Sequence, residues 1–218
     1  MFYFVVFFGI LLDMNYIVGL GNPDEKYEET RHNIGRDILL KFAKKHKLPE
    51  FIFDKKSNAL ISEGEYFFIK EGRKTKTKVP LTLILPETYM NNSGLALKKI
   101  ISNKKKAELL TVIYDDLDLG IGVTKMNFNK GTGGHKGLES IINNIKTKEF
   151  NRIRIGISPT TPTGKLKKPK GEEKVVKHVL GKFSPKEEKT INKIKNQGVK
   201  GIEMILELGR VKATNLFN

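Results

Sequence analysis

The sequence predicts an α/β fold, a single three-layer domain in which a twisted, mostly parallel (mixed) sheet is flanked by helices. Segments with strand and helix patterning alternate along the chain, which is typical of such layered folds. Residues 109–114 form a continuous apolar run that ends in acids, as in a strand buried on both faces. Glycine-rich turns also separate several of these segments. The 218 residues fit one large domain, and they contain no internal repeat.

The first predicted unit is strand, loop and helix. Residues 16–18 are β-rich and end in the turn sequence GLGNP at residues 19–23. Residues 34–45 follow with lysines on one side and an apolar stripe on the other, formed by Ile34, Ile38, Leu39 and Phe42. We therefore expect the loop at residues 19–33 to join a strand to an amphipathic helix.

The middle of the chain predicts more strands. Residues 66–70 and 81–85 have strand patterning and are joined by a basic turn, and residues 88–99 are expected to bridge a loop and a helix. The apolar run at 109–114 then supplies the buried central strand.

The last third predicts a helix, a strand and a long helix. The glycines at 131–137 precede a helix whose apolar residues are spaced i, i+3, i+4 and i+7, and residues 152–158 alternate as a strand. Residues 159–171, rich in Pro, Thr, Gly and Lys, are expected to form a mobile connection. Ser184 and Glu187 then form a predicted capping box around Pro185, which opens a helix towards Leu208.

Composition restricts the class of protein. The absence of cysteine excludes disulfides, thiolate nucleophiles and Cys-ligated metal centres, and it is compatible with the cytoplasmic location that we expect. The 40 Lys and Arg residues against 24 Asp and Glu give a net charge of +16, which attracts polyanions such as nucleic acid. A lysine-rich surface that only keeps the protein in solution is the alternative reading.

Residues 1–13 are read as an apolar N-terminal extension, separate from a domain at residues 14–218. The first twelve residues are uniformly apolar but lack the basic segment and cleavage site of a secretory signal, and they are too few to span a bilayer. Because Asp13 interrupts the run and Met14 precedes the first strand, our hypothesis is an artefact of start-site assignment. No later apolar run is long enough for a membrane span, so we expect no membrane partner.

Two common phosphate-binding motifs are absent. Gly19 and Gly21 follow a strand, but the third glycine of a dinucleotide-binding loop would fall at Asp24. A Walker A sequence is also missing. What remains is a glycine turn at a strand end, the edge of an α/β sheet where ligands commonly bind.

His32 and Asp115 are the candidate catalytic residues. His32 precedes the first predicted helix, whose positive end disfavours imidazolium, although a histidine at that place can also be a surface or capping residue. Asp115 ends the presumed central strand, and a carboxylate there could hold one imidazole nitrogen and leave the other free to activate water. A magnesium site built from Asp115, Asp116 and Asp118 is the alternative, and turn or capping roles remain open for the last two.

Two further loops carry polar groups. The sequence YMNNSG at residues 89–94 offers amides that can orient a carbonyl and an aromatic ring on which a base could stack. The sequence GTGGHKGL at residues 131–138 places backbone amides at a helix start, where Lys125, Lys130 and Lys136 could help to hold a phosphate. A flexible turn with a helix cap explains the second loop equally well.

Four ordered segments carry a family resemblance. They are GLGNP at 19–23 with Tyr27 and TRHNIG at 30–35, then YMNNSG at 89–94, DDLDL at 115–119 with Gly122, and GGHKGL at 133–138. In order and spacing they resemble the bacterial-type peptidyl-tRNA hydrolase, and VLG at 179–181 and KATN at 212–215 extend the likeness to almost everything from Tyr16 onward.

The resemblance implies hydrolysis of the ester that joins a peptide to the terminal ribose of tRNA, which recycles stalled peptidyl-tRNA. His32 would be the general base and Asp115 would hold it in its basic form. Asn91 would bind near the reacting carbonyl, and Asn22 would favour peptidyl over free aminoacyl esters. An ester needs little leaving-group help, so we expect no metal and no cofactor.

The resemblance also implies contacts with tRNA. Tyr27 and Tyr89 would contact its terminal adenosine, and the position of Lys136 belongs to the tRNA-binding set. We further expect the phosphates of the acceptor stem to be held, without regard to base sequence, by Lys125, Lys130 and Arg152 or Arg154. The protein is expected to act as a monomer.

Three departures from the family pattern stand out. Asp24 replaces a usual glycine, which a turn tolerates unless the backbone requires a positive φ. The connection at 158–175 is longer and more basic than the family pattern. Lys136 replaces an asparagine, and because lysine only donates hydrogen bonds it cannot reproduce both halves of an amide. Lys136 could grip phosphate or lower the pKa of a neighbouring group, and it motivates the alternative of an RNA-binding relative without hydrolysis.

Overall fold

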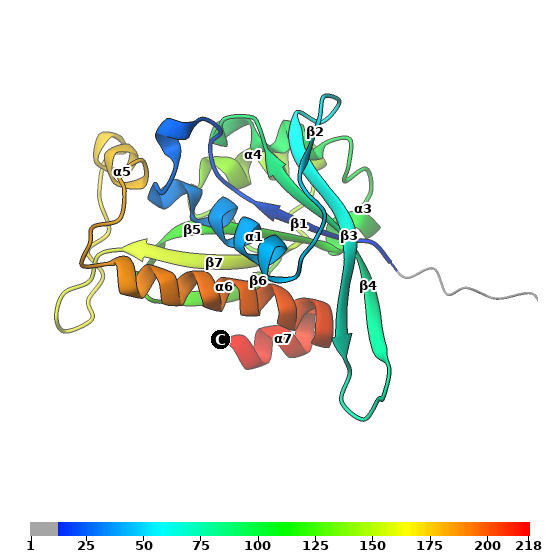
Figure 1. Ribbon diagram of the computed structural model, residues 1–218. Coiled ribbons are helices and arrows are strands. Elements are labelled where there is room, and N and C mark those ends of the chain that lie inside the picture. Colours follow the sequence, from blue (N-terminus) through cyan, green and yellow to red (C-terminus); the bar gives the residue numbers. More distant parts are fainter. Residues whose placement is uncertain (1–12) are drawn as a thin grey trace, which may run out of the picture.

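The computed structural model describes residues 13–218, which form a seven-stranded mixed sheet in the order β2-β3-β4-β1-β5-β7-β6 (Figure 1). The four central strands β4, β1, β5 and β7 are parallel, and antiparallel strands extend the sheet at both sides. The strands are β1 (Asn15–Gly19), β2 (Ile52–Asp54), β3 (Ala59–Ile69), β4 (Lys76–Pro86), β5 (Leu110–Gly120), β6 (Thr124–Phe128) and β7 (Asn151–Ser158).

Helices cover both faces of the sheet, so the three-layer α/β prediction is confirmed. Figure 1 looks onto the face covered by α1 (Ile34–Lys45), α6 (Glu188–Leu208) and α7 (Arg210–Phe217). The opposite face is covered by α2 (Ser93–Leu97), α3 (Lys104–Glu108) and α4 (Lys136–Ile145). The remaining helix α5 (Glu172–Val179) packs at the carboxyl edge of the parallel strands, against the short 3-10 helix η2 (Arg31–Asn33). Two further 3-10 helices are η1 (Glu25–Tyr27), which precedes η2, and η3 (Met90–Asn92), which precedes α2.

The predicted apolar stripe of α1 forms part of the core. Ile34, Ile38, Leu39 and Phe42 are all fully buried, and they pack against β-strand residues and against α6. The lysines on the other side of α1 stay towards solvent. The helix therefore forms where its apolar period is 3.6 residues, and burial of that stripe fixes it on the sheet.

Several boundaries differ from the sequence predictions. β3 and β4 are each 11 residues long, because the pairing between them extends well beyond the apolar segments. Five short elements were not predicted, namely β2, α3, β6, α5 and α7, and α5 begins directly after the segment at 159–171 that we expected to be a mobile connection. Their apolar periods are too brief to stand out from the lysine-rich sequence around them.

The predicted capping box is only half correct. Glu187 accepts hydrogen bonds from the backbone amide and the hydroxyl of Ser184, at 2.6 and 2.7 Å. However, α6 begins at Glu188, so Pro185 lies in the preceding turn rather than at the first helical position. Glu187 also pairs with Arg31, and this ion pair ties the start of α6 to η2.

Residues 1–12 lie outside the described part of the chain, so the hypothesis about the N-terminal extension stays a prediction. Among residues 13–218, no helix has the length and apolar character needed to cross a bilayer.

Candidate active site

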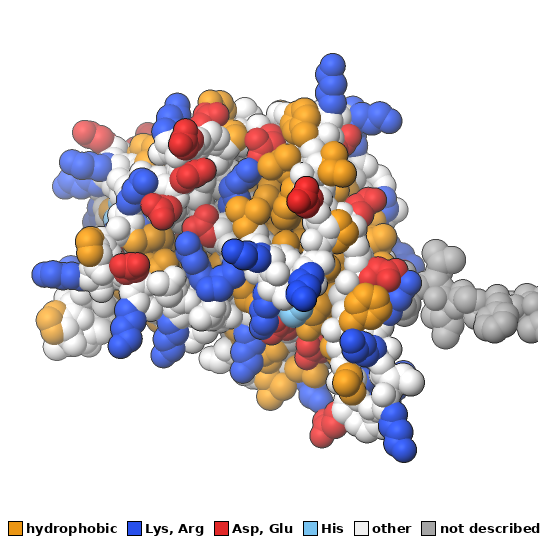
Figure 2. Space-filling model, in the orientation of Figure 1, with side chains coloured by type: hydrophobic (Ala, Val, Ile, Leu, Met, Phe, Trp, Pro, Cys, Tyr) orange, Lys and Arg blue, Asp and Glu red, His pale blue; other side chains and the backbone are white. Residues whose placement is uncertain are grey.

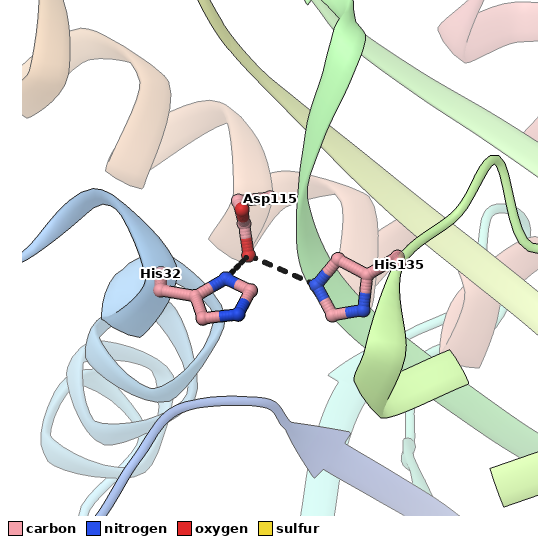
Figure 3. Close-up of side chains that lie close together, drawn as sticks. All are labelled: His32, Asp115 and His135. Carbon is pink, nitrogen blue, oxygen red and sulfur yellow. Dashed lines mark hydrogen bonds and ion pairs between the residues drawn. The ribbon is translucent and has the colours of Figure 1, made fainter. Parts of the chain in front are cut away.

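His32 and Asp115, 83 residues apart in sequence, meet at the carboxyl edge of the sheet. The Nδ1 atom of His32 lies 2.8 Å from Oδ1 of Asp115 (Figure 3). Because an ionised carboxylate only accepts hydrogen bonds, Nδ1 carries the proton and donates it. The Nε2 atom of His32 makes no hydrogen bond to residues 13–218 and is therefore free to accept a proton.

The packing of α1 against β5 brings the two side chains together. A β-carbon added to Gly35, in the first turn of α1, would lie 2.2 Å from the carbonyl oxygen of Ile113. Only glycine permits this approach. Since Gly19, the last residue of β1, pairs with Ile113, β5 continues past the end of β1, and Asp115 stands two residues beyond that point.

The sequence suggested that the central strand ends at Asp115, and this prediction is wrong. β5 runs on to Gly120, and its regular pairing with β7 is interrupted between Asp116 and Gly120. The strand continues because its polar residues find partners within the protein. Asp116 accepts a hydrogen bond from the amide of Asp118 and pairs with Arg154 at 2.7 Å.

Asp115 stays ionised although it is 2% exposed. Burial alone would raise its pKa, but the attraction and hydrogen bonds of His32 and His135 outweigh burial and hold the pKa well below the usual range. The site therefore keeps a fixed negative charge beside two imidazoles.

His135 completes the cluster, and the sequence reasoning did not single it out. Its Nε2 lies 3.0 Å from the same Oδ1 of Asp115 (Figure 3). Its Nδ1 accepts the backbone amide of Leu138 at 3.3 Å. His135 is thus the N-cap of α4, which fixes the proton on Nε2. Its place directly before a helix start was the available signal, but histidine is an uncommon N-cap.

These three side chains also have the composition of a metal site, since their ligand atoms lie within 4.8 Å of one another. A metal ligand atom must be free of a proton. On His135 the nitrogen that faces Asp115 carries the proton, because the other nitrogen accepts the helix amide. The magnesium alternative also loses support, because Asp116 pairs with Arg154 and Asp118 pairs with Lys168.

A cavity of about 190 Å³ opens beside the cluster. The glycine-rich loop at 132–136 forms one wall, and α5 covers it with the apolar side chains of Val175, Val176 and Val179. His32, Asp115 and Tyr114 line its floor. Apolar walls near the Asp115 carboxylate strengthen its electrostatic interactions inside such a site.

Asn22 is largely committed to holding two loops together. Its side-chain oxygen accepts the amide of Met90 at 2.8 Å, while its backbone forms two hydrogen bonds with the side chain of Asn33. Asn22 is 6% exposed, and its side-chain nitrogen Nδ2 makes no hydrogen bond within residues 13–218. That nitrogen is the part of Asn22 that remains available to a ligand.

Tyr27, in η1, and Tyr89, directly before η3, lie next to each other. Their ring centroids are 6.3 Å apart in an edge-to-face arrangement, and Tyr89 is 49% exposed. The hydroxyl of Tyr89 donates to Asp24 at 3.0 Å, a contact that raises the pKa of Tyr89. Asp24 has φ +71° and ψ 141°, so the turn does require a positive φ. Asn91 is exposed in η3, two residues from Tyr89.

The three candidate lysines are exposed. Lys136 is the first residue of α4, lines the cavity and pairs with Glu139 at 3.3 Å. Lys125 and Lys130 lie on β6 and on the loop that follows it. All three can reach a ligand from solvent.

Arg152 does not fit the predicted contact with phosphate. It is fully buried, and its guanidinium donates to the carbonyls of Lys130 and Gly131. Its role is to shape the glycine-rich loop from beneath. Arg154 is mostly buried as well, and it is held by Asp116 and Asn127. The sequence pattern could not separate these inward-facing arginines from surface ones.

The fold and the histidine–carboxylate pair define an open α/β enzyme whose free imidazole nitrogen can act as a base. Comparison with known proteins then identifies the family. The family model described as "Peptidyl-tRNA hydrolase" matches residues 16–218. The peptidyl-tRNA hydrolase of Trichodesmium erythraeum is 38% identical, with 93% of this chain and 87% of the relative covered. That of Thermodesulfovibrio yellowstonii is 37% identical, with 94% and 99% covered.

A solved structure gives the same result. The crystal structure of peptidyl-tRNA hydrolase from Acinetobacter baumannii superposes with a TM-score of 0.75 at 32% identity, and the match covers 94% of each chain. The chain belongs to the peptidyl-tRNA hydrolase family.

Proposed function

We propose that His32 is the general base in hydrolysis of peptidyl-tRNA, the reaction that names this family. The observation that most supports this proposal is the 2.8 Å hydrogen bond between His32 Nδ1 and the buried Asp115 carboxylate, because it leaves Nε2 as an acceptor. The substrate is the ester between a peptide, or an N-blocked amino acid, and the terminal ribose of tRNA.

The proposed reaction needs one base and one water molecule. Nε2 of His32 takes a proton from water as the water oxygen attacks the ester carbonyl, and Asp115 stabilises the imidazolium that forms. The tetrahedral intermediate then breaks its bond to the ribose oxygen, and His32 returns the proton to that oxygen. The products are a free peptide carboxylic acid and tRNA with its terminal hydroxyl restored.

His135 is a positioning residue in this proposal. It gives Asp115 a second hydrogen bond at 3.0 Å, so that the carboxylate oxygen facing His32 is held from both sides. Its own remaining nitrogen is occupied by the α4 amide, so it has no lone pair to offer water.

The proposed substrate contacts are aromatic, amide and lysine groups that the fold leaves free to bind. Tyr27 and Tyr89 present aromatic rings on which the terminal adenosine can stack. Asn91 and the free amide nitrogen of Asn22 can donate to the peptide or the ester carbonyl. The exposed Lys125, Lys130 and Lys136 can hold phosphates of the acceptor stem, which requires no base sequence. We further propose that the protein acts as a monomer in the cytoplasm.

A hydrolysis assay tests the proposal. Purified protein is incubated with N-acetyl-aminoacyl-tRNA, and release of the N-acetyl amino acid is measured for the parent and for His32→Ala. We expect a loss of about 10²–10⁴-fold in kcat for His32→Ala with tRNA binding retained. A parent that binds tRNA without cleaving it would support the RNA-binding relative instead. A fully active His32→Ala variant would overturn the base assignment.

A further inference from the structure

The β3–β4 hairpin projects beyond the rest of the sheet (Figure 1). β2 pairs with β3 only as far as Ile61, and β1 pairs with β4 only from Leu81 onward. Residues 65–80, named here the hairpin arm, therefore form a two-stranded ribbon without strand neighbours in the part of the chain that the structure describes.

One face of the hairpin arm is anchored to the body. Tyr66 is 4% exposed, stacks on Phe68 with ring centroids 5.9 Å apart and donates its hydroxyl to Glu207 of α6. An isolated two-stranded hairpin is at best marginally stable in water. These contacts hold the arm in a fixed direction.

The opposite face of the hairpin arm is exposed among residues 13–218, and it combines apolar and basic side chains. Phe67 and Ile69 are 51% and 63% exposed. The strand register places Lys78 opposite Phe67 and Lys76 opposite Ile69, so the four side chains share this face.

The end of the hairpin arm concentrates positive charge. Residues 70–78 contain five Lys and Arg residues and one acid, Glu71. Across residues 13–218, Lys78 is the only one of these five cations with an ion pair, which it makes with Glu65. Figure 2 shows lysine and arginine side chains at the free end of the arm. Lysines that only confer solubility would not explain the exposed Phe67 and Ile69 between them.

The hairpin arm is also far from the ester. β4 runs from within the arm to the catalytic edge, and its 11 residues, from Lys76 near the end of the arm to Pro86, correspond to about 35 Å. A ligand that touches both places must be long. Phosphates of helical RNA fit the uncompensated cations, and a ribose or an unpaired base fits the exposed aromatic ring.

We propose that the hairpin arm is a second RNA contact, which binds the backbone of the substrate tRNA away from its acceptor end. This proposal rests on the proposed function, because it takes peptidyl-tRNA as the ligand. The arm supplies affinity without base specificity, while the chemistry stays at His32. It therefore acts on KM and leaves kcat unchanged.

The test compares two substrates. One is full-length N-acetyl-aminoacyl-tRNA, and the other is the same N-acetyl-aminoacyl ester on the terminal trinucleotide alone. The arm variant is Lys74→Gln with Lys76→Gln. The matched control is Lys189→Gln with Lys193→Gln, two exposed lysines on α6. Phe67→Ser is measured separately.

For the arm variant we expect KM for full-length tRNA to rise about 5- to 10-fold, with kcat unchanged and with no change on the trinucleotide ester. The salt dependence of tRNA binding should lose about one unit of slope per lysine removed. Phe67→Ser should raise KM for full-length tRNA alone, and the control variant should behave as the parent. Circular dichroism checks that each variant is folded.

Three outcomes would overturn the arm contact. These are an unchanged KM for full-length tRNA, an equal rise on both substrates, or an equal rise in the α6 control. If the parent cleaves neither substrate, the function itself fails, and direct binding of uncharged tRNA by parent and arm variant still decides the contact. Unaltered tRNA binding by a folded arm variant would indicate a protein partner for this face and reject RNA.

Discussion

The loop that carries His32 and the loop that carries His135 deliver the same side chain to the same carboxylate oxygen, yet they produce different chemistry. His32 donates from Nδ1 and has a free Nε2, whereas His135 donates from Nε2 and uses Nδ1 to cap α4. The second nitrogen therefore decides the role of each imidazole. One histidine can act as a base, and the other can only hold the carboxylate.

The largest expected effect on the hydrolysis rate comes from replacing Asp115, which both histidines contact. Replacement Asp115→Asn keeps the size of the side chain but removes its charge, so neither the basic tautomer of His32 nor its imidazolium is stabilised. We expect kcat to fall by about 10²–10⁴-fold. Steady-state hydrolysis of N-acetyl-aminoacyl-tRNA measures this loss, and His32→Ala with Asp115→Asn should be little worse than His32→Ala alone. Additive losses in the double variant would show that the two residues act separately.

Lowering the pH should reproduce this loss reversibly. Protonation of Nε2 removes the lone pair of His32, so the rate should fall when the pH is lowered. Asp115 is not the cause of this fall. Its folded-state pKa is lowered, so its stabilising effect is present above the ordinary carboxyl pKa of about 3.9 and is lost only below it.

A pH–rate profile of kcat/KM from pH 8 to pH 5, with circular dichroism at each end, checks this. The rate should fall while the spectrum stays that of the folded protein. A flat profile down to pH 5 would contradict a histidine base.

The sequence was sufficient to predict the fold class and the meeting of His32 with Asp115, because both depend on local patterns. A buried strand, a glycine turn and an apolar helical stripe set the edge of the sheet, and parallel strands bring their carboxyl ends to one place. His135 was missed because its role depends on which nitrogen caps α4, and hydrogen-bond direction leaves no mark in a sequence.

Arg152 shows that the sequence could not predict which side chains are buried. Its strand pattern allowed either direction for the side chain, and only the packed structure shows that it is buried beneath the glycine-rich loop. An arginine near a basic loop is not evidence of a phosphate contact until its exposure is known.

Substitution of His135 separates its two functions, with a smaller effect on rate. His135→Asn keeps a side chain that caps a helix well, and His135→Ala removes the cap, but both lose the hydrogen bond to Asp115. We expect both variants to lose about tenfold in kcat. Both should lose stability with the hydrogen bond to the buried carboxylate, and His135→Ala should lose about 1 kcal/mol more, or roughly 2–4 °C in Tm, because it also lacks the cap. Thermal melts and hydrolysis rates measure the two effects, and full activity of His135→Asn would reject the positioning role.

The smallest effect concerns the backbone of the two loops. The His135 loop places Gly133 and Gly134 at its positive φ angles, of +61° and +80°, whereas the loop before His32 has Asp24 at φ +71° and ψ 141°. A residue with a β-carbon in that region costs roughly 1–3 kcal/mol, and the exposed hydrogen bond from Tyr89 offsets only part of it. Asp24→Gly removes the strain, but it gives the unfolded chain more conformational entropy, which costs about 0.4–1 kcal/mol of stability. We expect a net gain in stability of about 1 kcal/mol, or roughly 2–4 °C in Tm, measured by calorimetry.

Asp24→Ala is the matched control. It loses the hydrogen bond and keeps the β-carbon, so it should melt below the parent. Equal melting of the two variants would show that the turn relaxes around a side chain and that no backbone strain is stored at Asp24.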